Sequence, residues 1–500
     1  MLFNSYAFIC VFLPATLIGF FVLARAGKLW ATCWLVLASL LFYAYWNPHY
    51  LPLLLGSIVF NYAAGRLLVR NAAGTRPLNK SAILAVAIGS NLLLLAYYKY
   101  AGFFVENTDA VLGLDWSIPH IVLPLGISFF TFTQIAYLVD VYRGTAREAR
   151  FIHYALFVSY FPHLIAGPIL HHSEMMPQFT RDDVYSWDSD RFVNGMVVFT
   201  IGLVKKVVLA DGVAAFVGPA FQAVGLGHAP SLVEAWGAAF AYTFQLYFDF
   251  SGYCDMAIGA SWLFGIGLPL NFNSPYKAAN IIDFWHRWHI TLSRFLRDYL
   301  YIPLGGNRRG SIRRYVNLLA TMVIGGLWHG AGWTFVIWGG LHGLYLVINH
   351  AWAAMRSRIE LPTLGRAGAI LSWAITFLAV VVGWVFFRAP SLQDALHMVV
   401  GMSGANGLGL DRSAASFTEV YWTWAWCVGL GAIAFILPNT EEIMAPYLPQ
   451  IAKPAGTSGP IRWAALTFSP SLGWAAVTAV LLAAGLISLP QPTNFLYFNF

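Results

Sequence analysis

The stretch "AFICVFLPATLIGFFVLA" (7–24) contains no Asp, Glu, Lys or Arg over its whole length. A helix that crosses a bilayer needs about 20 mostly apolar residues, so this stretch predicts a transmembrane helix. Comparable apolar stretches follow near 30–46, 50–67, 82–98 and 120–142. Because helices satisfy their own backbone hydrogen bonds in lipid, the first third of the chain predicts an all-α, polytopic membrane protein.

The composition of the whole chain agrees with this fold class. Of its 500 residues, 59% are hydrophobic and only 10% are charged, whereas soluble domains carry about 25% charged residues. Four scattered cysteines (Cys10, Cys33, Cys254 and Cys427) form no CxxC pair, so neither a disulfide framework nor a metal site is predicted. Basic cytoplasmic loops account for the net charge of +7 without a nucleic-acid partner.

The charges between the first apolar stretches alternate in sign. Basic residues follow the first, third and fifth stretches and acidic residues follow the fourth, at Arg25, Lys28, Arg66, Arg70, Arg76, Lys80, Glu106, Asp109, Asp115, Arg143, Arg147 and Arg150. Basic loops stay in the cytoplasm, so the N-terminus is predicted outside. No basic residue precedes the first stretch, which favours a retained helix over a cleaved signal peptide. A bacterial inner membrane is the expected location.

The middle of the chain is less regular than its start. The apolar stretch "FVSYFPHLIAGPIL" (157–170) is interrupted by Pro162 and Pro168, which predicts a kinked or re-entrant segment buried in protein. Further apolar stretches lie near 192–204, 207–219, 233–248, 253–270, 315–328, 332–349, 367–387, 421–437 and 471–489. We expect roughly eleven to thirteen membrane-embedded helices. They form one domain over 1–500, with N-terminal helices in 1–150, a core in 151–350 and C-terminal helices in 351–500.

The stretch "NIIDFWHRWHITLSRFLRDYLYIPLGGNRRGSIRR" (280–314) holds much of the polar chemistry. If 283–298 is one helix, a single polar stripe carries His286, His289, Ser293 and Arg297. Asp283–Arg287 and Arg294–Asp298 then form supporting i,i+4 pairs. The alternative interpretation is an interfacial helix whose charges are merely solvated.

The loop that follows, "LGGNRRGSIRR" (304–314), is rich in glycine and arginine. Arg308 and Arg309 either anchor the loop at the cytoplasmic face or bind the phosphates of a cytosolic donor. The loop does not match a phosphate-binding P-loop or a dinucleotide-binding fingerprint.

A histidine, His329, interrupts the apolar region in "GGLWHGAGW" (325–333), beside Trp328. An ionisable residue at membrane depth marks a functional site by default, and a neutral imidazole can act as a general base near pH 7. The alternative is a buried histidine with a purely structural role, which is the interpretation we adopt for His342. The glycines around His329 allow a backbone or a ligand to approach closely.

Two aspartates, Asp249 and Asp255, lie in the aromatic stretch "QLYFDFSGYCDMAIG" (245–259). Carboxylates at membrane depth need partners, and we expect them to pair with His or Arg of 283–298. Six residues apart, they do not share a helix face, so a two-carboxylate glycosidase is disfavoured. The absence of a Gly-x-Ser-x-Gly motif disfavours a serine hydrolase.

Several blocks together resemble the membrane-bound O-acyltransferases, in particular the bacterial branch that acetylates exopolysaccharides such as alginate. They are "FPHLIAGPI" (161–169), "QLYFDFSGYCDMAIG" (245–259), "NFNSPY" (271–276), "FWHRWHITLSRFLRDYLYIPLGGNR" (284–308) and "GGLWHGAGW" (325–333). The resemblance implies a ring of transmembrane and re-entrant helices around a central funnel and tunnel. It implies that His329 is the central catalytic residue and His289 the second polar position.

The resemblance also implies a donor and partners. Acetyl-CoA would be the donor substrate, with no permanently bound cofactor. A periplasmic or membrane-anchored SGNH-like acetyltransferase would complete the modification of a polysaccharide. Residues expected to bind donor or substrate are Ser293, Arg297, Arg308, Arg309, Trp328 and Asp255.

The mechanism predicted from these residues is general base catalysis. His329 removes the proton of the acceptor hydroxyl, or forms an acetyl-histidine intermediate, while His289 orients the thioester or donates a hydrogen bond to the developing oxyanion. Alternatives are D-alanyl transfer to teichoic acid, acetyl transfer to cellulose or peptidoglycan, and a transporter in which the buried His and Asp relay protons.

Overall fold

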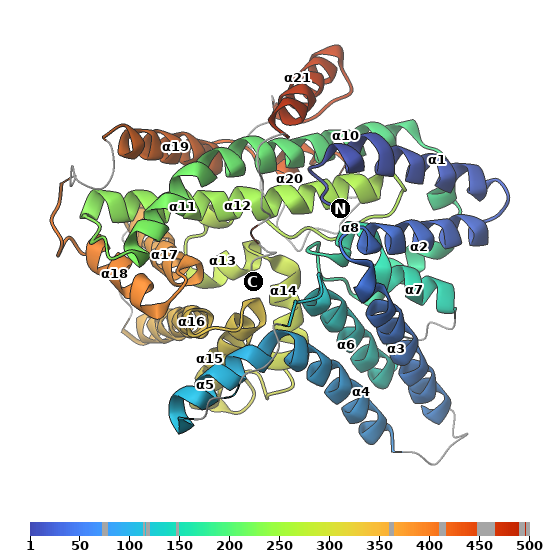
Figure 1. The fold of residues 1–500 in the computed structure, drawn as a ribbon, viewed down its shortest axis with the longest axis horizontal. Coiled ribbons are helices and arrows are strands. Elements are labelled where there is room, and N and C mark those ends of the chain that lie inside the picture. The colour runs from blue at the N-terminus through green and yellow to red at the C-terminus, as the bar shows by residue number, and fades with distance from the viewer. Residues whose placement is uncertain are drawn as a thin grey trace.

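The computed structural model describes residues 1–72, 79–113, 116, 121–146, 150–359, 365–409, 417–447, 466–489 and 496. Arg76, Asp115 and Arg147, on which part of the predicted topology depends, lie outside these residues. Within the described residues every regular element is a helix, which confirms the predicted all-α class. The long helices lie around two short ones, α13 (Ile281–Arg287) and α14 (Ile290–Leu296), near the centre of the view (Figure 1).

The predicted N-terminal spans form helices. They are α1 (Leu13–Ala24), continuous with the π-helical η1 (Ala7–Phe12), α2 (Lys28–Ala44), η2 (Pro48–Tyr50), α3 (Leu51–Ala72), α4 (Lys80–Leu95), η3 (Ala96–Tyr100), α5 (Ala101–Leu112) and α6 (Ile127–Arg143). Asn79 starts α4 by accepting the backbone N–H of Ser81 at 2.9 Å, which satisfies one of the unpaired donors at that helix terminus.

The predicted break in 157–170 is present. α7 (Phe151–Ser159) ends at Tyr160, and α8 (Phe161–Leu164) begins with Pro162 in its first turn. The side chain of Ser39 accepts the backbone N–H of Phe161 at 3.1 Å. Residues 160–170 are buried throughout, so the irregular backbone is enclosed by protein, as irregular backbone at membrane depth must be.

The central and C-terminal helices complete the structure. They are α9 (His172–Met175), η4 (Met176–Thr180), η5 (Asp183–Tyr185), α10 (Ser189–Val204), η6 (Lys205–Ala210), α11 (Asp211–Gly225), α12 (Leu232–Trp262), η7 (Pro275–Lys277), η8 (Arg297–Tyr301), α15 (Gly310–His329), α16 (Trp333–Ile359), α17 (Gly365–Arg388), α18 (Leu392–Met402), α19 (Phe417–Ile436), α20 (Thr440–Ile443) and α21 (Leu472–Ser488). The apolar stretches predicted at 233–248 and 253–270 belong largely to one helix, α12, which has 31 residues.

Six helical segments in the described part of the chain are long and apolar enough to cross a membrane. They are Ala7–Ala24, Pro48–Arg70, Lys80–Leu112, Ser189–Gly225, Gly365–Arg388 and Glu419–Ile436, and Lys28–Ala44 and Leu472–Ser488 are shorter apolar helices. The protein is therefore a multi-pass membrane protein. The total of roughly eleven to thirteen embedded helices stays a prediction.

Glycine allows the closest helix packing in the core. A Cβ added to Gly202 of α10 would lie 2.6 Å from the carbonyl oxygen of Gly252 in α12. A Cβ added to Gly326 of α15 would overlap the backbone oxygen of Phe335 in α16. Small residues at such contacts let helix backbones approach each other in a membrane, and the second contact holds the helix that carries His329.

Candidate active site

His329 is the last residue of α15, and its side chain is buried inside the protein with 5% of its surface exposed. Its ring is surrounded by the rings of Trp328 (4.9 Å between centroids), Trp338 of α16 (5.1 Å) and Phe387 of α17 (5.2 Å). The ring of His289 lies 6.4 Å away. The structure thus brings the two predicted histidines together in an aromatic cage rather than placing His329 against lipid.

Lys99 and Tyr100 of η3 hold the end of α15. The Lys99 ammonium donates to the carbonyl oxygens of Trp328 (2.5 Å) and His329 (3.0 Å), and the Tyr100 hydroxyl donates to that of Leu327 (2.8 Å). The last carbonyls of a helix have no partner within it and carry a partial negative charge, so a cation is stabilising there. Sequence analysis did not single out Lys99; the signal was a lysine directly after the apolar stretch 82–98.

The glycines around His329 serve close packing of protein on protein. A Cβ added to Gly330 would overlap the ring of Phe335, and one added to Gly326 would overlap that residue's backbone oxygen. Of the two possibilities raised by the sequence, approach of a backbone or of a ligand, the structure shows the approach of α16.

The prediction of one helix over 283–298 is wrong. α13 ends at Arg287, α14 begins at Ile290, and His289 between them has φ +43°, in the left-handed region. The predicted polar stripe is therefore divided: His286 and Arg297 are exposed, Ser293 is half-buried, and His289 is fully buried. Left-handed backbone is costly for a residue with a Cβ and is kept only where its surroundings enforce it.

Of the two predicted ion pairs in this region, one is confirmed. Arg287 contacts Asp283 at 2.7 Å. The pair Arg294–Asp298 is absent from the described contacts: the guanidinium of Arg294 contacts Glu174 (2.8 Å), and Asp298 pairs with Arg297 (2.7 Å).

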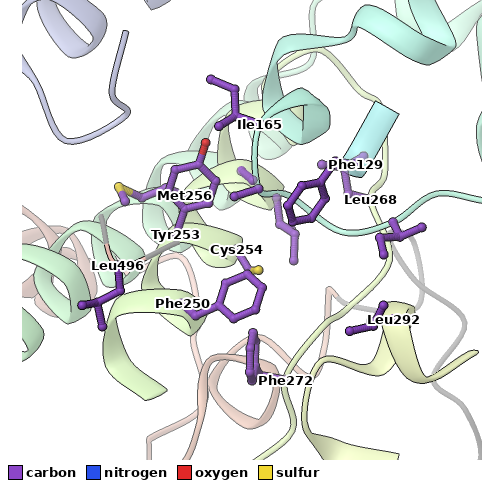
Figure 2. Close-up of a cluster of buried hydrophobic side chains, with 14 of the residues drawn as sticks. Phe129, Ile165, Phe250, Tyr253, Cys254, Met256, Leu268, Phe272, Leu292 and Leu496 are labelled. Carbon is purple, nitrogen blue, oxygen red and sulfur yellow. The ribbon is translucent and has the colours of Figure 1, made fainter. Parts of the chain in front are cut away.

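Asn271 of "NFNSPY" fixes the backbone at this break. Its backbone oxygen accepts the N–H of Ile290 at 3.0 Å, and its side-chain oxygen accepts from the Nδ1 of His289 at 3.1 Å and from the N–H of Thr291 at 3.2 Å. Phe250 lies between Cys254 and Phe272 in Figure 2, and the ring of Phe250 contacts that of His289 edge-on at 4.8 Å. The site is thus polar at a few defined atoms and apolar elsewhere.

A row of aromatic rings runs from the histidines to η8. The ring of Phe132 in α6 stacks on Trp328 (5.2 Å) and on Phe295 (4.3 Å), and Phe295 contacts Tyr299 (5.0 Å). The predicted site residue Trp328 is therefore the first ring of this row beyond His329, and Tyr299 is its other end.

Tyr299 borders a polar pocket of about 340 Å³. The pocket is lined by Asp140, Arg143, Thr145, His171, His172, Ser173, Asp298, Tyr299 and Ile302. The Tyr299 hydroxyl is 2.9 Å from the carboxylate of Asp140 and 3.1 Å from the Nδ1 of His171. Sequence analysis missed this pocket because its residues come from segments far apart in the chain.

The predicted donor-binding arginines Arg308 and Arg309 lie apart from the histidines. Arg308 and Arg309 are exposed on the loop before α15, and 20 residues of α-helix separate them from His329, about 30 Å along the axis. Arg297 is exposed, and the Ser293 hydroxyl donates to the backbone of Trp288 at 3.3 Å. The structure thus leaves Arg308 and Arg309 far from the two histidines, whereas the backbone N–H of Ser293 donates to the carbonyl oxygen of His289 at 3.0 Å.

The two aspartates pair with lysines, so the prediction that they pair with residues of 283–298 is wrong. Asp249 contacts Lys206 at 2.6 Å, and Lys206 also contacts Asp211 at 2.6 Å. Asp255 contacts Lys205 at 2.7 Å and the hydroxyl of Thr440 at 2.6 Å. Both lysines lie in the π-helical η6, whose wider turn presents consecutive lysines to α12. In the part of the chain that the structure describes, no group of three His, Cys, Asp or Glu side chains could hold a metal ion.

Comparison with known proteins identifies the family. The pattern that defines MBOAT, the membrane-bound O-acyltransferase family, matches residues 147–389, a range that includes both histidines. A peptidoglycan O-acetyltransferase of Helicobacter pylori is 42% identical over 100% of this chain and 98% of its own length. A probable alginate O-acetylase of Pseudomonas aeruginosa is 43% identical over 80% of this chain and 75% of its own. A teichoic acid D-alanyltransferase of Bacillus subtilis is 28% identical over 54% of this chain and 70% of its own.

The fold and the site define an all-α, multi-pass membrane protein with a buried pair of histidines. The chain belongs to the membrane-bound O-acyltransferase family. It is an O-acyltransferase, as the resemblance implied, and the transporter alternative is set aside.

Proposed function

We propose that the protein takes acetyl from cytosolic acetyl-CoA and passes it across the membrane for O-acetylation of an exopolysaccharide, through a periplasmic partner acetyltransferase. The observation that carries this proposal is the buried pair of rings, His329 and His289, with centroids 6.4 Å apart. Relatives named as alginate O-acetylases support acetyl as the group and a polysaccharide as its destination. The protein then resides in a bacterial inner membrane with its N-terminus outside.

The reaction follows from the chemistry of a thioester and a hydroxyl. His329 accepts the proton of the acceptor hydroxyl, whose oxygen bonds to the acyl carbon as the carbon–sulfur bond breaks. The proton then passes from His329 to the departing sulfur, and coenzyme A leaves as the free thiol. General base catalysis contributes typically about 10²–10⁴-fold, and the rings of Trp338 and Phe387 exclude the water that would hydrolyse the thioester.

The donor's path starts at the polar pocket beside Tyr299. With the N-terminus outside, the end of α6 that lines this pocket faces the cytosol. The aromatic row Tyr299–Phe295–Phe132–Trp328 leads from there to His329, and the long pantetheine arm of coenzyme A would lie along these rings. The exposed Arg308 and Arg309 bind its phosphates outside the membrane.

A second candidate acceptor is peptidoglycan. The Helicobacter pylori relative named for that activity matches the chain from end to end. Both acceptors use the same histidines and the same donor, and they differ only in which exported glycan receives the acetyl group. Acetyl analysis of both polymers from a strain lacking the gene, with and without the gene restored, distinguishes them.

The experiment that tests the proposal replaces His329 and supplies labelled acetyl-CoA. His329→Ala should reduce transfer of label to polymer and release of free coenzyme A by at least about 10²-fold, with insertion and thermal unfolding in detergent unchanged. His289→Asn should also lose most activity, since asparagine tolerates the left-handed backbone at that position. His342→Ala is the matched control, because His342 is equally buried and packs against the same Trp338 at 4.9 Å.

Normal transfer by His329→Ala would overturn the catalytic assignment. If His342→Ala abolished transfer as fully as His329→Ala, without unfolding the protein, loss of any histidine buried among these rings would have the same effect. That result would overturn the specific role of His329.

A further inference from the structure

Asn271 makes several hydrogen bonds to the segment around His289. Its backbone oxygen accepts from Ile290. Its side-chain oxygen Oδ1 accepts from the N–H of Thr291 (3.2 Å), the hydroxyl of Thr291 (2.9 Å) and the Nδ1 of His289 (3.1 Å). All these partners lie in three consecutive residues, at the point where the backbone turns left-handed.

The orientation of the Asn271 amide is determined by its neighbours. A backbone N–H can only donate, so the atom that faces the N–H of Thr291 must be the oxygen Oδ1. The other end agrees, because Nδ2 donates to the sulfur of Cys254 at 3.3 Å. An amide turned by 180° would set an NH₂ group against the Thr291 N–H and leave that donor without an acceptor.

This orientation decides which nitrogen of His289 carries the proton. Because Oδ1 only accepts, the Nδ1 that faces it must be protonated. A neutral imidazole carries one proton, so its other nitrogen, Nε2, presents a lone pair. His289 therefore accepts a hydrogen bond at Nε2 while it is neutral.

We propose that Asn271 is a positioning residue that holds His289 in the Nδ1–H form, so that Nε2 of His289 accepts a hydrogen bond from a polar group of the acceptor beside the reacting hydroxyl and does not bind the thioester. This inference depends on the acetyl transfer proposed above. An acetyl thioester offers no N–H or O–H at its reacting end, so a lone pair cannot hold it. The single proton of the reacting hydroxyl goes to His329, so a neighbouring O–H or N–H of the acceptor donates to Nε2. This bond holds the reacting hydroxyl beside His329, whose ring centroid lies 6.4 Å from that of His289.

The assignment changes the role expected for His289 from the sequence. Donation to the developing oxyanion requires a proton on Nε2, which the neutral Nδ1–H form lacks. Cys254 of α12, Asn271 and His289 instead form one chain of hydrogen bonds whose last member faces the site. The motif "NFNSPY" thus contributes to the reaction through its first residue.

Two substitutions at position 271 separate positioning from stability. Asn271→Leu keeps the volume and removes the hydrogen bonds, and turnover should fall by at least about tenfold, because a small misplacement of a reacting group is costly. Asn271→Asp keeps an accepting oxygen and adds a negative charge that stabilises protonated His289. The pKa of His289 rises in this variant. Because only neutral His289 accepts a hydrogen bond from the acceptor, the acid limb of the pH–rate profile moves to higher pH.

The kinetic constants give a second readout. The KM for acetyl-CoA should stay within about twofold of the unsubstituted protein in both variants, since the thioester does not bind His289, whereas the KM for the acceptor rises. Cys254→Ala, which removes the partner of Nδ2 and so loosens the amide, should show a weaker form of the Asn271→Leu effect, and Cys254→Ser should restore activity. A pH profile that Asn271→Asp leaves unmoved, with normal folding, would overturn the proposal.

Nitrogen NMR of the protein labelled with ¹⁵N-histidine tests the tautomer directly. The His289 signals, assigned by their loss in His289→Asn, should report a protonated Nδ1 and an unprotonated Nε2, and Asn271→Leu should populate the other form. A protonated Nε2 in the unsubstituted neutral protein would overturn the inference. This measurement needs no turnover, so it tests the tautomer independently of the proposed function. Failure of acetyl transfer would refute the proposed function and would not change the tautomer result.

Discussion

Two clusters of buried ionisable side chains differ in how their charges are satisfied. In the first, His329 and His289 lie among aromatic rings and can be neutral near pH 7. In the second, Lys206 is 1% exposed and contacts both Asp211 and Asp249 at 2.6 Å. The charges of the second cluster neutralise one another, whereas the first cluster holds neutral rings of the kind that the proposed transfer requires.

The comparison teaches that burial of an ionisable group in a membrane protein does not by itself identify a catalytic residue. The lysine–aspartate cluster also receives distant parts of the chain: the N–H of Leu496 donates to Asp249 at 3.2 Å, and Thr440 donates to Asp255 at 2.6 Å. Figure 2 shows Leu496 near Tyr253 and Met256, two residues of α12, the helix that also carries both aspartates. The cluster therefore joins the C-terminal part of the chain to α12, which is a structural task.

The largest effect is expected where a charge loses its partner. Lys206→Met leaves the carboxylates of Asp211 and Asp249 buried together, and breaking a buried ion pair typically costs about 3–5 kcal/mol. We expect little folded protein by size-exclusion chromatography and a large loss in thermal stability. Combining Lys206→Met with Asp211→Asn and Asp249→Leu should restore much of the folded yield, since no unpaired charge remains.

The opposite outcome would break the comparison. If Lys206→Met accumulated and melted normally but transferred no acetyl group, the second cluster would be part of the catalytic machinery.

A moderate effect is expected at Lys99, a charged residue that belongs to the histidine cluster. Lys99→Met removes the donor to the carbonyl oxygens of Trp328 and His329, which should destabilise the protein by about 1–2 kcal/mol and displace the His329 ring. Turnover should fall by about tenfold. Misplacing a catalytic group by 1 Å can cost about 10²-fold, and we expect a smaller displacement of the His329 ring here. Kinetics and thermal unfolding of the same preparation measure both quantities.

Tyr100→Phe is the matched control for Lys99→Met. It removes one hydrogen bond from the same helix end, to Leu327 at 2.8 Å, but leaves the carbonyls of His329 and Trp328 bound. Its activity should stay within a few-fold of the unsubstituted protein. Equal losses from both substitutions would mean that general loosening of α15, and not the placement of His329, limits the reaction.

The sequence predicted the parts of this architecture that depend on local pattern. Apolar length predicted the helices, the prolines at 162 and 168 predicted the broken segment, and the apolar setting of His329 predicted a buried imidazole. The prediction that His289 acts together with His329 depended on the family resemblance. Helical periodicity failed at 283–298 because hydrogen bonds that His289 and Thr291 donate to Asn271, outside that stretch, enforce a left-handed residue that no periodicity reveals.

The partners of the buried aspartates also could not be predicted from the sequence. Asp249 and Asp255 needed cations, and arginines and histidines of 283–298 were as plausible as Lys205 and Lys206 until the packing of α10 and η6 against α12 was known. The same holds for Lys99, since only the fold places η3 beside the end of α15. Long-range polar contacts produce no periodic pattern in the sequence. Such contacts hold both the histidine cluster and the lysine–aspartate cluster in place.

The smallest effect is expected at charges that belong to neither cluster. Arg308 and Arg309 are exposed on a loop at the far end of α15 from His329, so their attraction for phosphates is screened by salt. Replacing both with Gln should raise the KM for acetyl-CoA by about two- to fivefold without changing kcat, because uniform binding is lost and the transition state is untouched. The increase should shrink at high ionic strength, and Arg313→Gln, an exposed arginine in the next turn, serves as control. A fall in kcat in the double variant would place these arginines with the histidine cluster after all, and an unchanged KM would mean that the donor's phosphates bind elsewhere.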